Sequence, residues 1–284
     1  MPSDEQRRAA VLGSPIEHSL SPVLHGAAYT ALGLTGWTYE RIEADEQQLV
    51  EFVPGLGAEW AGLSVTMPGK RAALRVADVV SSRAEAVGAA NTLVHRADGS
   101  WAADCTDVDG VVGALRAAGG FYTGHRGLVL GAGGTAAATL AGFAELGIRE
   151  ATIAVREPAR ARDAVETAER VGIAASVERL DRVALADAAA AADVVVSTLP
   201  AGALGERVAE LATAACVLDV VYHPWPTPLA AAVTAAGGRV ATGLDMLLHQ
   251  SFGQVEQFTG LSAPRKVMRD ALANATGNEI PLPL

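Results

Sequence analysis

The sequence predicts an α/β protein built from two domains. Short apolar segments, typical of buried strands, alternate with helical patterns along most of the 284 residues, and such alternation implies parallel sheets covered by helices. Glycines at positions 119, 120 and 124 interrupt the alternation, and a new α/β series follows them. Half of the residues are hydrophobic, so the chain can bury a sizeable core.

The first domain is predicted to cover residues 1–107. Its clearest signal is a helix start at Pro22, since proline is favoured at the first helical position and Ser21 precedes it as an N-cap. A turn at residues 97–99 separates two short strands. The expected strands are residues 9–12, 38–42, 62–66, 91–95 and 101–102, and the expected helices are 22–32, 47–52, 71–76 and 81–87.

The second domain is predicted to cover residues 108–242, and residues 243–284 form a helical C-terminal part. The tail after Gly277 is expected to fray, because it is short and rich in proline. The expected strands of the second domain are 127–130, 152–155, 194–197 and 217–221, with helices at 108–118, 135–146, 158–171 and 227–236. The expected C-terminal helices are 245–258 and 264–273.

Composition narrows the class of partner. The net charge of −10 argues against a nucleic acid or an anionic membrane, which would call for basic patches. Residues 1–5 lack the apolar region of a signal peptide, no apolar run is long enough to span a membrane, and the two cysteines have no paired spacing. A cytoplasmic protein with reduced thiols is expected. The six histidines show no metal-ligand spacing, so no metal is expected.

A glycine-rich turn after the strand at 127–130 predicts a dinucleotide site. Gly131 permits the tight turn, Gly133 lets the backbone approach a pyrophosphate, and Ala136 allows close packing of helix and strand. The free N–H groups at the start of the helix, at Gly134 and Thr135, favour an anion. The alternative is an ordinary glycine turn of an α/β protein, which the surrounding strand–turn–helix–strand order makes the weaker interpretation.

The end of the next strand favours NADP over NAD. A dinucleotide site for NAD usually has an acidic residue there, whereas this chain has Arg156, whose charge and fork of donors suit a 2′-phosphate. Arg160, one helical turn later, adds a second cation. Glu157 would repel the phosphate if it pointed inward. The alternative for both arginines is a solvated position at a helix start.

Two ionisable residues of the first domain, Lys70 and Asp107, stand at the starts of helices. A Lys/Asp pair brought together can hold a hydroxyl and move its proton. Considered alone, Lys70 would be interpreted as a surface lysine and Asp107 as a helix N-cap. Ser19 and Ser21 supply two hydroxyls suited to a carboxylate or polyol, although Ser21 taken alone reads as an N-cap and Ser19 as a loop residue.

Several motifs in order resemble the shikimate dehydrogenase family, over nearly the whole chain. The resemblance implies an NADP-dependent enzyme that reduces 3-dehydroshikimate to shikimate in the biosynthesis of chorismate and the aromatic amino acids, with the C-terminal helices packed back on the first domain. The motifs are GSPIEHSLSP at 13–22, SVTMPGK at 64–70, GAANTL at 88–93, Thr106-Asp107, the Gly131 loop, residues 219–228 and GLDMLLHQ at 243–250.

By this resemblance, Lys70 and Asp107 form the catalytic pair. The remaining roles fall into two groups, one for the substrate and one for the cofactor. Ser19, Ser21 and Tyr222 are implied at the substrate carboxylate, and Thr66, Asn91 and Gln250 at its ring hydroxyls. Gly243 and Met246 are implied at the nicotinamide and Thr198 near the cofactor, beside Gly131, Gly133, Gly134, Thr135, Ala136, Arg156 and Arg160.

Departures from the family pattern leave alternatives open. Cys105 and Ser64 each replace a common asparagine, and Val108 a common glycine. The alternatives are a paralogue acting on quinate, another cyclitol acid or an aminated shikimate analogue, a catalytically silent NADP-binding regulator, and a folate-type dehydrogenase of similar build, against which the paired serines speak. The expected partner is a small-molecule substrate, shikimate or 3-dehydroshikimate, with no nucleic acid and no membrane, in a monomer or homodimer.

Overall fold

The chain divides into two compact units. The structure is a computed structural model that describes residues 6–284, so residues 1–5, whose polar character argued against a signal peptide, lie outside the described residues. Unit 1 consists of the chain up to Thr106 together with Gln250–Leu282 and Leu284, and unit 2 consists of Asp107–His249 and Pro283. Unit 1 thus ends one residue before the predicted boundary, and residues 243–249 belong to unit 2 rather than to the C-terminal part.

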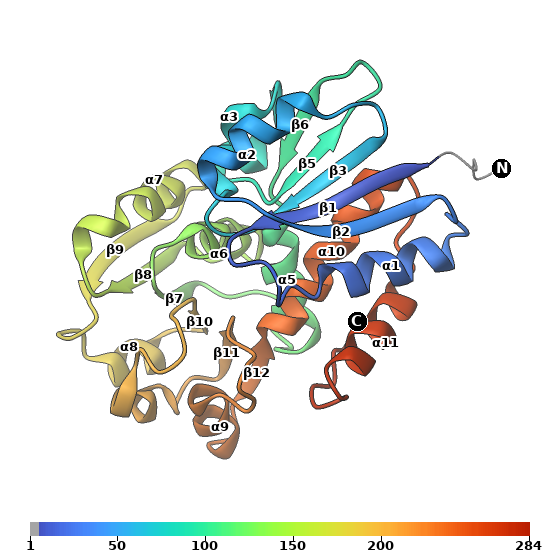
Figure 1. Ribbon diagram of the computed structural model, residues 1–284. Helices are drawn as coiled ribbons and strands as arrows, with labels where there is room; N and C mark the ends of the chain where they lie inside the picture. The colour runs from blue at the N-terminus through green and yellow to red at the C-terminus, as the bar shows by residue number, and fades with distance from the viewer. Residues whose placement is uncertain (1–5) are drawn as a thin grey trace. The chain divides into compact units, whose positions relative to one another are not determined.

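Unit 1 is built on a six-stranded mixed sheet (Figure 1). Its strands are β1 (Arg7–Gly13), β2 (Trp37–Glu43), β3 (Trp60–Val65), β4 (Val79–Val80), β5 (Thr92–His95) and β6 (Trp101–Asp104). The spatial order is β2-β1-β3-β5-β6-β4. Strands β1, β2 and β3 run parallel, whereas β5 is antiparallel to both β3 and β6. The carboxyl ends of β3 and β6 and the start of β5 therefore meet at one edge of the sheet.

The N-terminal helices of unit 1 are α1 (Ser21–Ala31), α2 (Glu46–Phe52), the 3₁₀ turn η1 (Val53–Gly55), α3 (Lys70–Val76) and α4 (Ser82–Val87). The predicted N-cap at Ser21 is wrong. Leu20 occupies the cap position without a side-chain cap, and Ser21 is the first helical residue. The reason is that Ser21 is buried, and its hydroxyl hydrogen-bonds Tyr39 of β2 instead of the helix start.

C-terminal helices complete unit 1. Helix α10 (Gly243–Thr259) enters unit 1 at Gln250 and packs closely on β3, where a Cβ at Gly62 would overlap the Phe258 ring. Helix α11 (Arg265–Ala275) packs against α1 (Figure 1). The prediction of a frayed tail is wrong, because Ile280 and Leu282 are buried and the carbonyl of Pro283 accepts a hydrogen bond from His249. Apolar burial holds a segment that its length and prolines suggested would be loose.

Unit 2 is a doubly wound domain with a parallel six-stranded sheet in the order β12-β11-β10-β7-β8-β9. This order is that of dinucleotide-binding folds, so the predicted fold class is confirmed.

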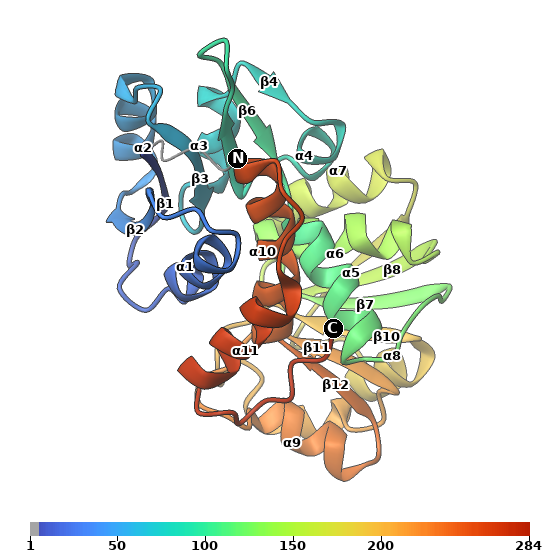
Figure 2. The same cartoon turned by 90° about the vertical axis from the view of Figure 1, so that its right-hand side faces the viewer.

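Helices cover both faces of this sheet. Helices α5 to α7 cover one face, and α8, η3 and α9 cover the other; Figure 2 shows α5 and α6 side by side. The strands are β7 (Arg126–Leu130), β8 (Glu150–Val155), β9 (Ala174–Arg179), β10 (Val194–Ser197), β11 (Cys216–Asp219) and β12 (Arg239–Thr242). The helices are α5 (Asp107–Ala117), α6 (Gly134–Glu145), η2 (Pro158–Ala161), α7 (Arg162–Arg170), α8 (Leu185–Ala191), η3 (Gly205–Leu211) and α9 (Pro228–Ala235).

Four elements of unit 2 escaped prediction: β9, β12, α8 and the 3₁₀ turn η3. Strands β9 and β12 form the two edges of the sheet, and partly exposed edge strands such as β9 show no apolar run. Helix α8 is short and rich in alanine, which blurs its period. The helix predicted at 158–171 begins as the 3₁₀ turn η2 and becomes α-helical only at Arg162.

Candidate active site

In unit 2, most predicted cofactor residues lie at one edge of the sheet. All strands of this sheet are parallel, so their carboxyl ends point the same way, and ligands of such sheets bind at that edge. Chain segments that follow five of the strands therefore come together there. They begin at Gly131 after β7, Arg156 after β8, Thr198 after β10, Val220 (with Tyr222) after β11 and Gly243 after β12.

Gly131 occupies a position that only glycine can fill without strain. Its φ is +110°, and a Cβ would overlap Oγ1 of Thr198. Thr198 is fixed in turn, because both its N–H and its hydroxyl donate to the carbonyl of Leu130, each at 2.9 Å. The structure thus brings Thr198 to the glycine turn.

Gly133 and the start of α6 form an open cradle. No atom lies within 4 Å of where a Cβ of Gly133 would stand. Gly133 is the N-cap of α6 and has no side chain to satisfy the first N–H groups, which belong to Gly134, Thr135 and Ala136. The geometry fits a dinucleotide pyrophosphate, which would approach the bare backbone and meet the positive end of the helix dipole.

The two arginines after β8 differ in their surroundings. Arg160 pairs with Glu157, its Nε lying 3.0 Å from Oε2, and both side chains are largely exposed. Glu157 thus engages Arg160, whereas Arg156 is exposed at the strand end and takes part in no ion pair among the described residues.

Tyr222 and Gly243 touch each other. A Cβ at Gly243 would lie 2.9 Å from Cδ1 of the Tyr222 ring. The start of α10 is fixed by a capping box in which Thr242 N–H donates to Asp245 Oδ2 (2.8 Å) and Asp245 N–H donates to Thr242 Oγ1 (3.3 Å). Met246 is 7% exposed and packs into the core of unit 2.

In unit 1, backbone hydrogen bonds gather the predicted substrate residues at one sheet edge. Thr66 N–H donates to the carbonyl of Leu12 at the end of β1, and Ala90 N–H donates to the carbonyl of Lys70. Val65 N–H donates to the carbonyl of Asn91 (2.8 Å). These links tie the starts of α3 and β5 to the ends of β1 and β3, and so bring Thr66, Lys70 and Asn91 together.

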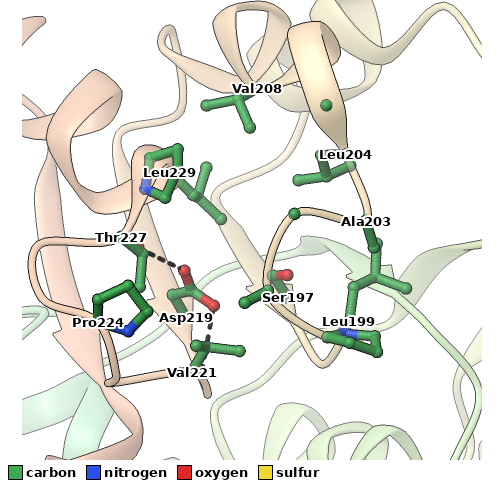
Figure 3. Close-up of a pocket in the computed structure, with 15 residues that line it drawn as sticks. Ser197, Leu199, Ala203, Leu204, Val208, Asp219, Val221, Pro224, Thr227 and Leu229 are labelled. Atoms are coloured by element: carbon green, nitrogen blue, oxygen red, sulfur yellow. Dashed lines mark hydrogen bonds between the residues drawn. The ribbon is translucent and has the colours of Figure 1, made fainter.

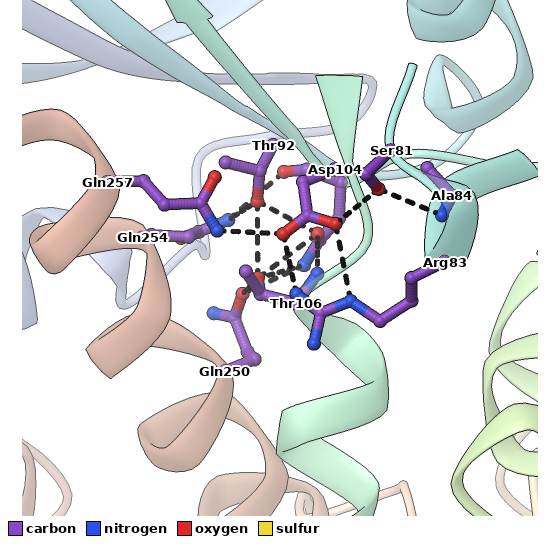
Figure 4. A network of polar contacts seen from close by, with 10 residues as sticks. Ser81, Arg83, Ala84, Thr92, Asp104, Thr106, Gln250, Gln254 and Gln257 are labelled. Carbon is purple, nitrogen blue, oxygen red and sulfur yellow. Dashed lines mark hydrogen bonds and ion pairs between the residues drawn. The ribbon is translucent and has the colours of Figure 1, made fainter. Parts of the chain in front are cut away.

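The Asn91 side chain is the centre of a buried polar network. Figure 4 labels its partners Thr92, Thr106 and Gln250. Asn91 Nδ2 donates to Thr106 Oγ1 (3.0 Å) and to Gln250 Oε1 (2.9 Å), and its Oδ1 accepts from Thr106 N–H (2.8 Å). Thr92 Oγ1 also donates to Asn91 Oδ1 (2.9 Å). The accepting role of Oδ1 and the donating role of Nδ2 are thereby fixed, and Gln250 must turn its own amide N–H₂ away from Asn91, toward Ser251.

Sequence reasoning missed a second layer behind Asn91. Gln254, one helical turn after Gln250, donates from Nε2 to the Asn91 carbonyl (3.0 Å) and to Thr92 Oγ1 (3.2 Å). Its Oε1 accepts from Ser64 (2.8 Å). Gln254 could have been found from its spacing, because residues four apart lie on the same face of a helix and Gln250 was already predicted as a site residue. Ser64, noted as a departure from the family, is therefore a buried link in this layer.

The layer continues to an aromatic cluster. Tyr39 donates to the Ser64 hydroxyl (2.7 Å), and its ring stacks on His25 at 4.0 Å between centroids. Burial lowers the pKa of His25 to about 3, and only the hydrogen bond to Gln254 opposes the shift. The neutral tautomer with its proton on Nε2 suits both contacts of the ring, with Gln254 Oε1 and the Tyr29 hydroxyl.

Asp104 carries a charged branch of the network (Figure 4). Arg83 Nη2 lies 2.5 Å from Asp104 Oδ2, and Ser81 and Gln257 also donate to the carboxylate. Burial alone would raise the pKa of Asp104, but the hydrogen bonds from Arg83 and Ser81 outweigh it and lower the pKa.

The remaining predicted residues lie at helix starts. Ser19 is half-buried before α1, and its carbonyl accepts two bonds from Arg41 (2.9 and 2.6 Å). Ser19 Oγ accepts from Ser21 N–H at 3.3 Å. Asp107 is buried, opens α5 and directly follows Thr106 in the chain.

Among residues 6–284, no helix is long and apolar enough to cross a membrane. Over the same range, no three histidine, cysteine, aspartate or glutamate side chains cluster as metal ligands would.

A doubly wound unit with a glycine cradle, joined to a second α/β unit that gathers a lysine and buried amides, defines the class of two-domain dinucleotide-dependent dehydrogenases. Family models sharpen this class. The model described as the shikimate dehydrogenase substrate binding domain matches residues 11–93, and that described as the shikimate 5′-dehydrogenase C-terminal domain matches residues 243–273.

Individual relatives agree. The shikimate dehydrogenase (NADP(+)) of Methylobacterium radiotolerans is 38% identical over 89% of this chain and 91% of its own. The crystal structure of Mycobacterium tuberculosis shikimate dehydrogenase is 55% identical, with a TM-score of 0.88 over 94% of this chain and 99% of that one. The Thermus thermophilus enzyme in complex with NADP(H) and shikimate is 33% identical, with a TM-score of 0.81 over 95% and 100%. The chain belongs to the shikimate dehydrogenase family, and the predicted resemblance is confirmed.

Proposed function

We propose that this protein catalyses the reversible, NADP-dependent reduction of 3-dehydroshikimate to shikimate. The observation that carries the proposal is the gathering of Thr66, Lys70 and Asn91 at one edge of unit 1, in a chain that also holds an open glycine cradle. Relatives named shikimate dehydrogenase (NADP(+)) support the same substrate and cofactor. The enzyme is thus an oxidoreductase that acts on a secondary alcohol.

NADPH, when bound, supplies the hydride that reduces the substrate carbonyl. The task of the protein is then to provide a proton and to stabilise the negative charge that develops on oxygen. Lys70 is proposed for both, because an ammonium group can donate a proton and attract an alkoxide. The Asp107 carboxylate accepts a hydrogen bond from the neighbouring ring hydroxyl and so orients the reacting carbon.

Substrate orientation is proposed to depend on side chains whose donor and acceptor roles are set by hydrogen bonds within unit 1. The Gln250 amide accepts from Asn91 through Oε1 and donates to Ser251 through Nε2, and the same N–H₂ group is proposed to donate to a ring hydroxyl of the substrate. Thr66 adds a second hydroxyl contact. Ser19, Ser21 and Tyr222 are proposed to hold the carboxylate through their hydroxyls.

The proposed cofactor contacts follow the edge of unit 2. The pyrophosphate would be held by the backbone from Gly131 to Ala136, and the nicotinamide portion by Thr198, Gly243 and Met246. Arg156 is proposed to bind the 2′-phosphate, with Arg160 adding charge once it leaves Glu157.

Initial rates test the function directly. NADP⁺ reduction by the purified protein should be fastest with shikimate, and slower with quinate as substrate or with NAD⁺ as cofactor. Faster turnover of quinate would instead assign the chain to the cyclitol paralogue. Tight NADP⁺ binding without turnover of either acid would indicate the silent regulator.

The contribution of Arg156 can be isolated by comparing Arg156→Ala with Arg160→Ala. We expect KM for NADP⁺ to rise about 10- to 100-fold in Arg156→Ala, because a charge-assisted hydrogen bond is lost. Arg160→Ala should change KM less, and KM for NAD⁺ should be nearly constant in both. Equal effects on the two cofactors would contradict a role at the 2′-phosphate.

The proposal also includes a cytoplasmic location and a place in chorismate biosynthesis. Cys105 and Cys216 are both buried, and neither forms a disulfide. Thiols that form no disulfide are typical of a reducing compartment.

A further inference from the structure

A cavity of about 270 Å³ lies in unit 2, on the sheet face covered by η3 and α9 (Figure 3). This volume is slightly below the usual range for small-molecule sites, roughly 300–1,000 Å³, and so suits a small ligand. The walls are mainly apolar, and three prolines contribute to them. The wall residues include Leu199, Leu204, Val208, Val221, Pro224 and Leu229.

Two buried polar groups line the inner end of the cavity. Ser197 and Asp219 are neighbours in register on β10 and β11 and are only 3% and 4% exposed. Asp219 accepts from the Thr227 hydroxyl (2.7 Å) and from the N–H of Val221 (3.3 Å). The Ser197 hydroxyl has no hydrogen-bond partner within the described part of the chain, and Figure 3 shows it beside the cavity. The Ser197 hydroxyl is therefore open to a molecule in the cavity.

The cavity is separate from the dinucleotide cradle. Neither Gly131 nor Thr198 lines it, and the Thr198 hydroxyl is turned away to the carbonyl of Leu130. Leu199 forms the partition, because it lines the cavity and also lies 3.6 Å from where a Cβ of Gly131 would stand.

The chemistry of the lining limits what can bind. Asp219 is the one ionisable side chain among the lining residues, and it would repel phosphates and carboxylates. The phosphates of the dinucleotide and the carboxylate of the acid substrate are thereby disfavoured. An aliphatic or aromatic body matches the walls, and a single O–H or N–H group can donate to Asp219 while it contacts Ser197.

We propose that this cavity is a binding site for an uncharged, mainly apolar molecule of one or two rings that carries one hydrogen-bond donor. The site is additional to the proposed oxidoreductase activity and does not depend on it. Its ligand and the dinucleotide bind to the same unit at the same time.

Calorimetric titration with 2-naphthol, in saturating NADP⁺, tests the proposal on the full-length protein. We expect saturable binding with one site, and no such binding of 2-naphthoate, which has the same rings and a negative charge. Absence of saturable 2-naphthol binding would overturn the proposal. Equal affinity for the naphthoate, or complete displacement of 2-naphthol by NADP⁺, would also overturn it.

Two variants locate the bound probe. Val208→Trp should weaken 2-naphthol binding at least tenfold by filling the cavity, and Ser197→Ala should weaken it about fivefold through loss of one hydrogen bond. Retained NADP⁺ affinity shows that each variant is folded, and Ser197→Ala carries the test alone if Val208→Trp does not fold. Wild-type affinity for 2-naphthol in the folded variants would contradict this location.

Discussion

Units 1 and 2 build their polar edges in opposite ways. In unit 1 the groups at the edge are side chains, and each is fixed by another, as Asn91 is by Thr92 and Thr106. In unit 2 the edge is mostly backbone. Gly131 and Gly133 suit a cofactor there because they have no side chain. Deleting atoms should therefore damage the edge of unit 1, whereas adding atoms should damage the edge of unit 2.

The strongest test of the side-chain edge is Lys70→Ala. Loss of the ammonium should lower kcat by about 10²- to 10⁴-fold, because the proton donor and its charge are both removed, with little effect on KM. Steady-state kinetics with shikimate and NADP⁺ measures both constants. A near-wild-type kcat would refute the assignment of Lys70.

Adding a single methyl group tests the backbone edge. Gly131→Ala should raise the Kd for NADP⁺ at least tenfold, because the left-handed backbone and the overlap with Thr198 both force the turn to move. Gly133→Ala is the matched control, since its Cβ would meet nothing in the protein and would obstruct only the pyrophosphate. Gly133→Ala should therefore weaken NADP⁺ binding without lowering Tm, whereas Gly131→Ala should do both; an unchanged Tm in Gly131→Ala would break the contrast.

Deleting the hidden layer of unit 1 should have an intermediate effect. Gln254→Met keeps the length of the side chain but leaves Ser64 and Thr92 short of partners, so the Asn91 amide loosens. We expect KM for shikimate to rise about tenfold, kcat to change less, and the free energy of unfolding to fall by about 1–3 kcal/mol. Gln257→Met, on the same helix but bound to Asp104, is the control and should leave KM unchanged. Equal KM values in the two variants would rule out a positioning role for Gln254.

The smallest effect concerns the pH dependence of stability, where the two units should differ in sign. The pKa of Asp104 is lowered, so its stabilising contribution exists above its ordinary pKa and is lost as pH falls. Burial raises the pKa of Asp245, so its contribution exists at low pH and is lost as pH rises. Urea unfolding from pH 3.5 to 7 should show Asp104→Asn losing stability relative to wild type as pH rises, and Asp245→Asn gaining. Parallel curves for the two variants would contradict these opposite shifts.

The same contrast explains what the sequence could predict. The cradle of unit 2 is a local pattern, because Gly131, Gly133 and Ala136 lie within six consecutive residues and their spacing carries the physics. The edge of unit 1 is assembled by strand pairing between distant segments, so Asn91 and Gln250 could be named only through family resemblance.

Other features depended on contacts that no local pattern contains. Gln254 and Ser64 are 190 positions apart, and each looks unremarkable alone. Ile280 and Leu282 are buried against surfaces made by earlier segments, so their own neighbourhood suggested a frayed end. Serine is preferred at helix N-caps, which suggested that role for Ser21, but its side chain hydrogen-bonds Tyr39 instead.

The buried histidine of unit 1 has a consequence for enzyme kinetics. A histidine that takes part in a reaction ordinarily gives a breakpoint at about pH 6.5 in a plot of log kcat against pH. With its pKa at about 3, His25 remains uncharged across the whole range in which such profiles are recorded. A breakpoint near neutrality must therefore be assigned to a different group, and replacing His25 should leave its position unchanged.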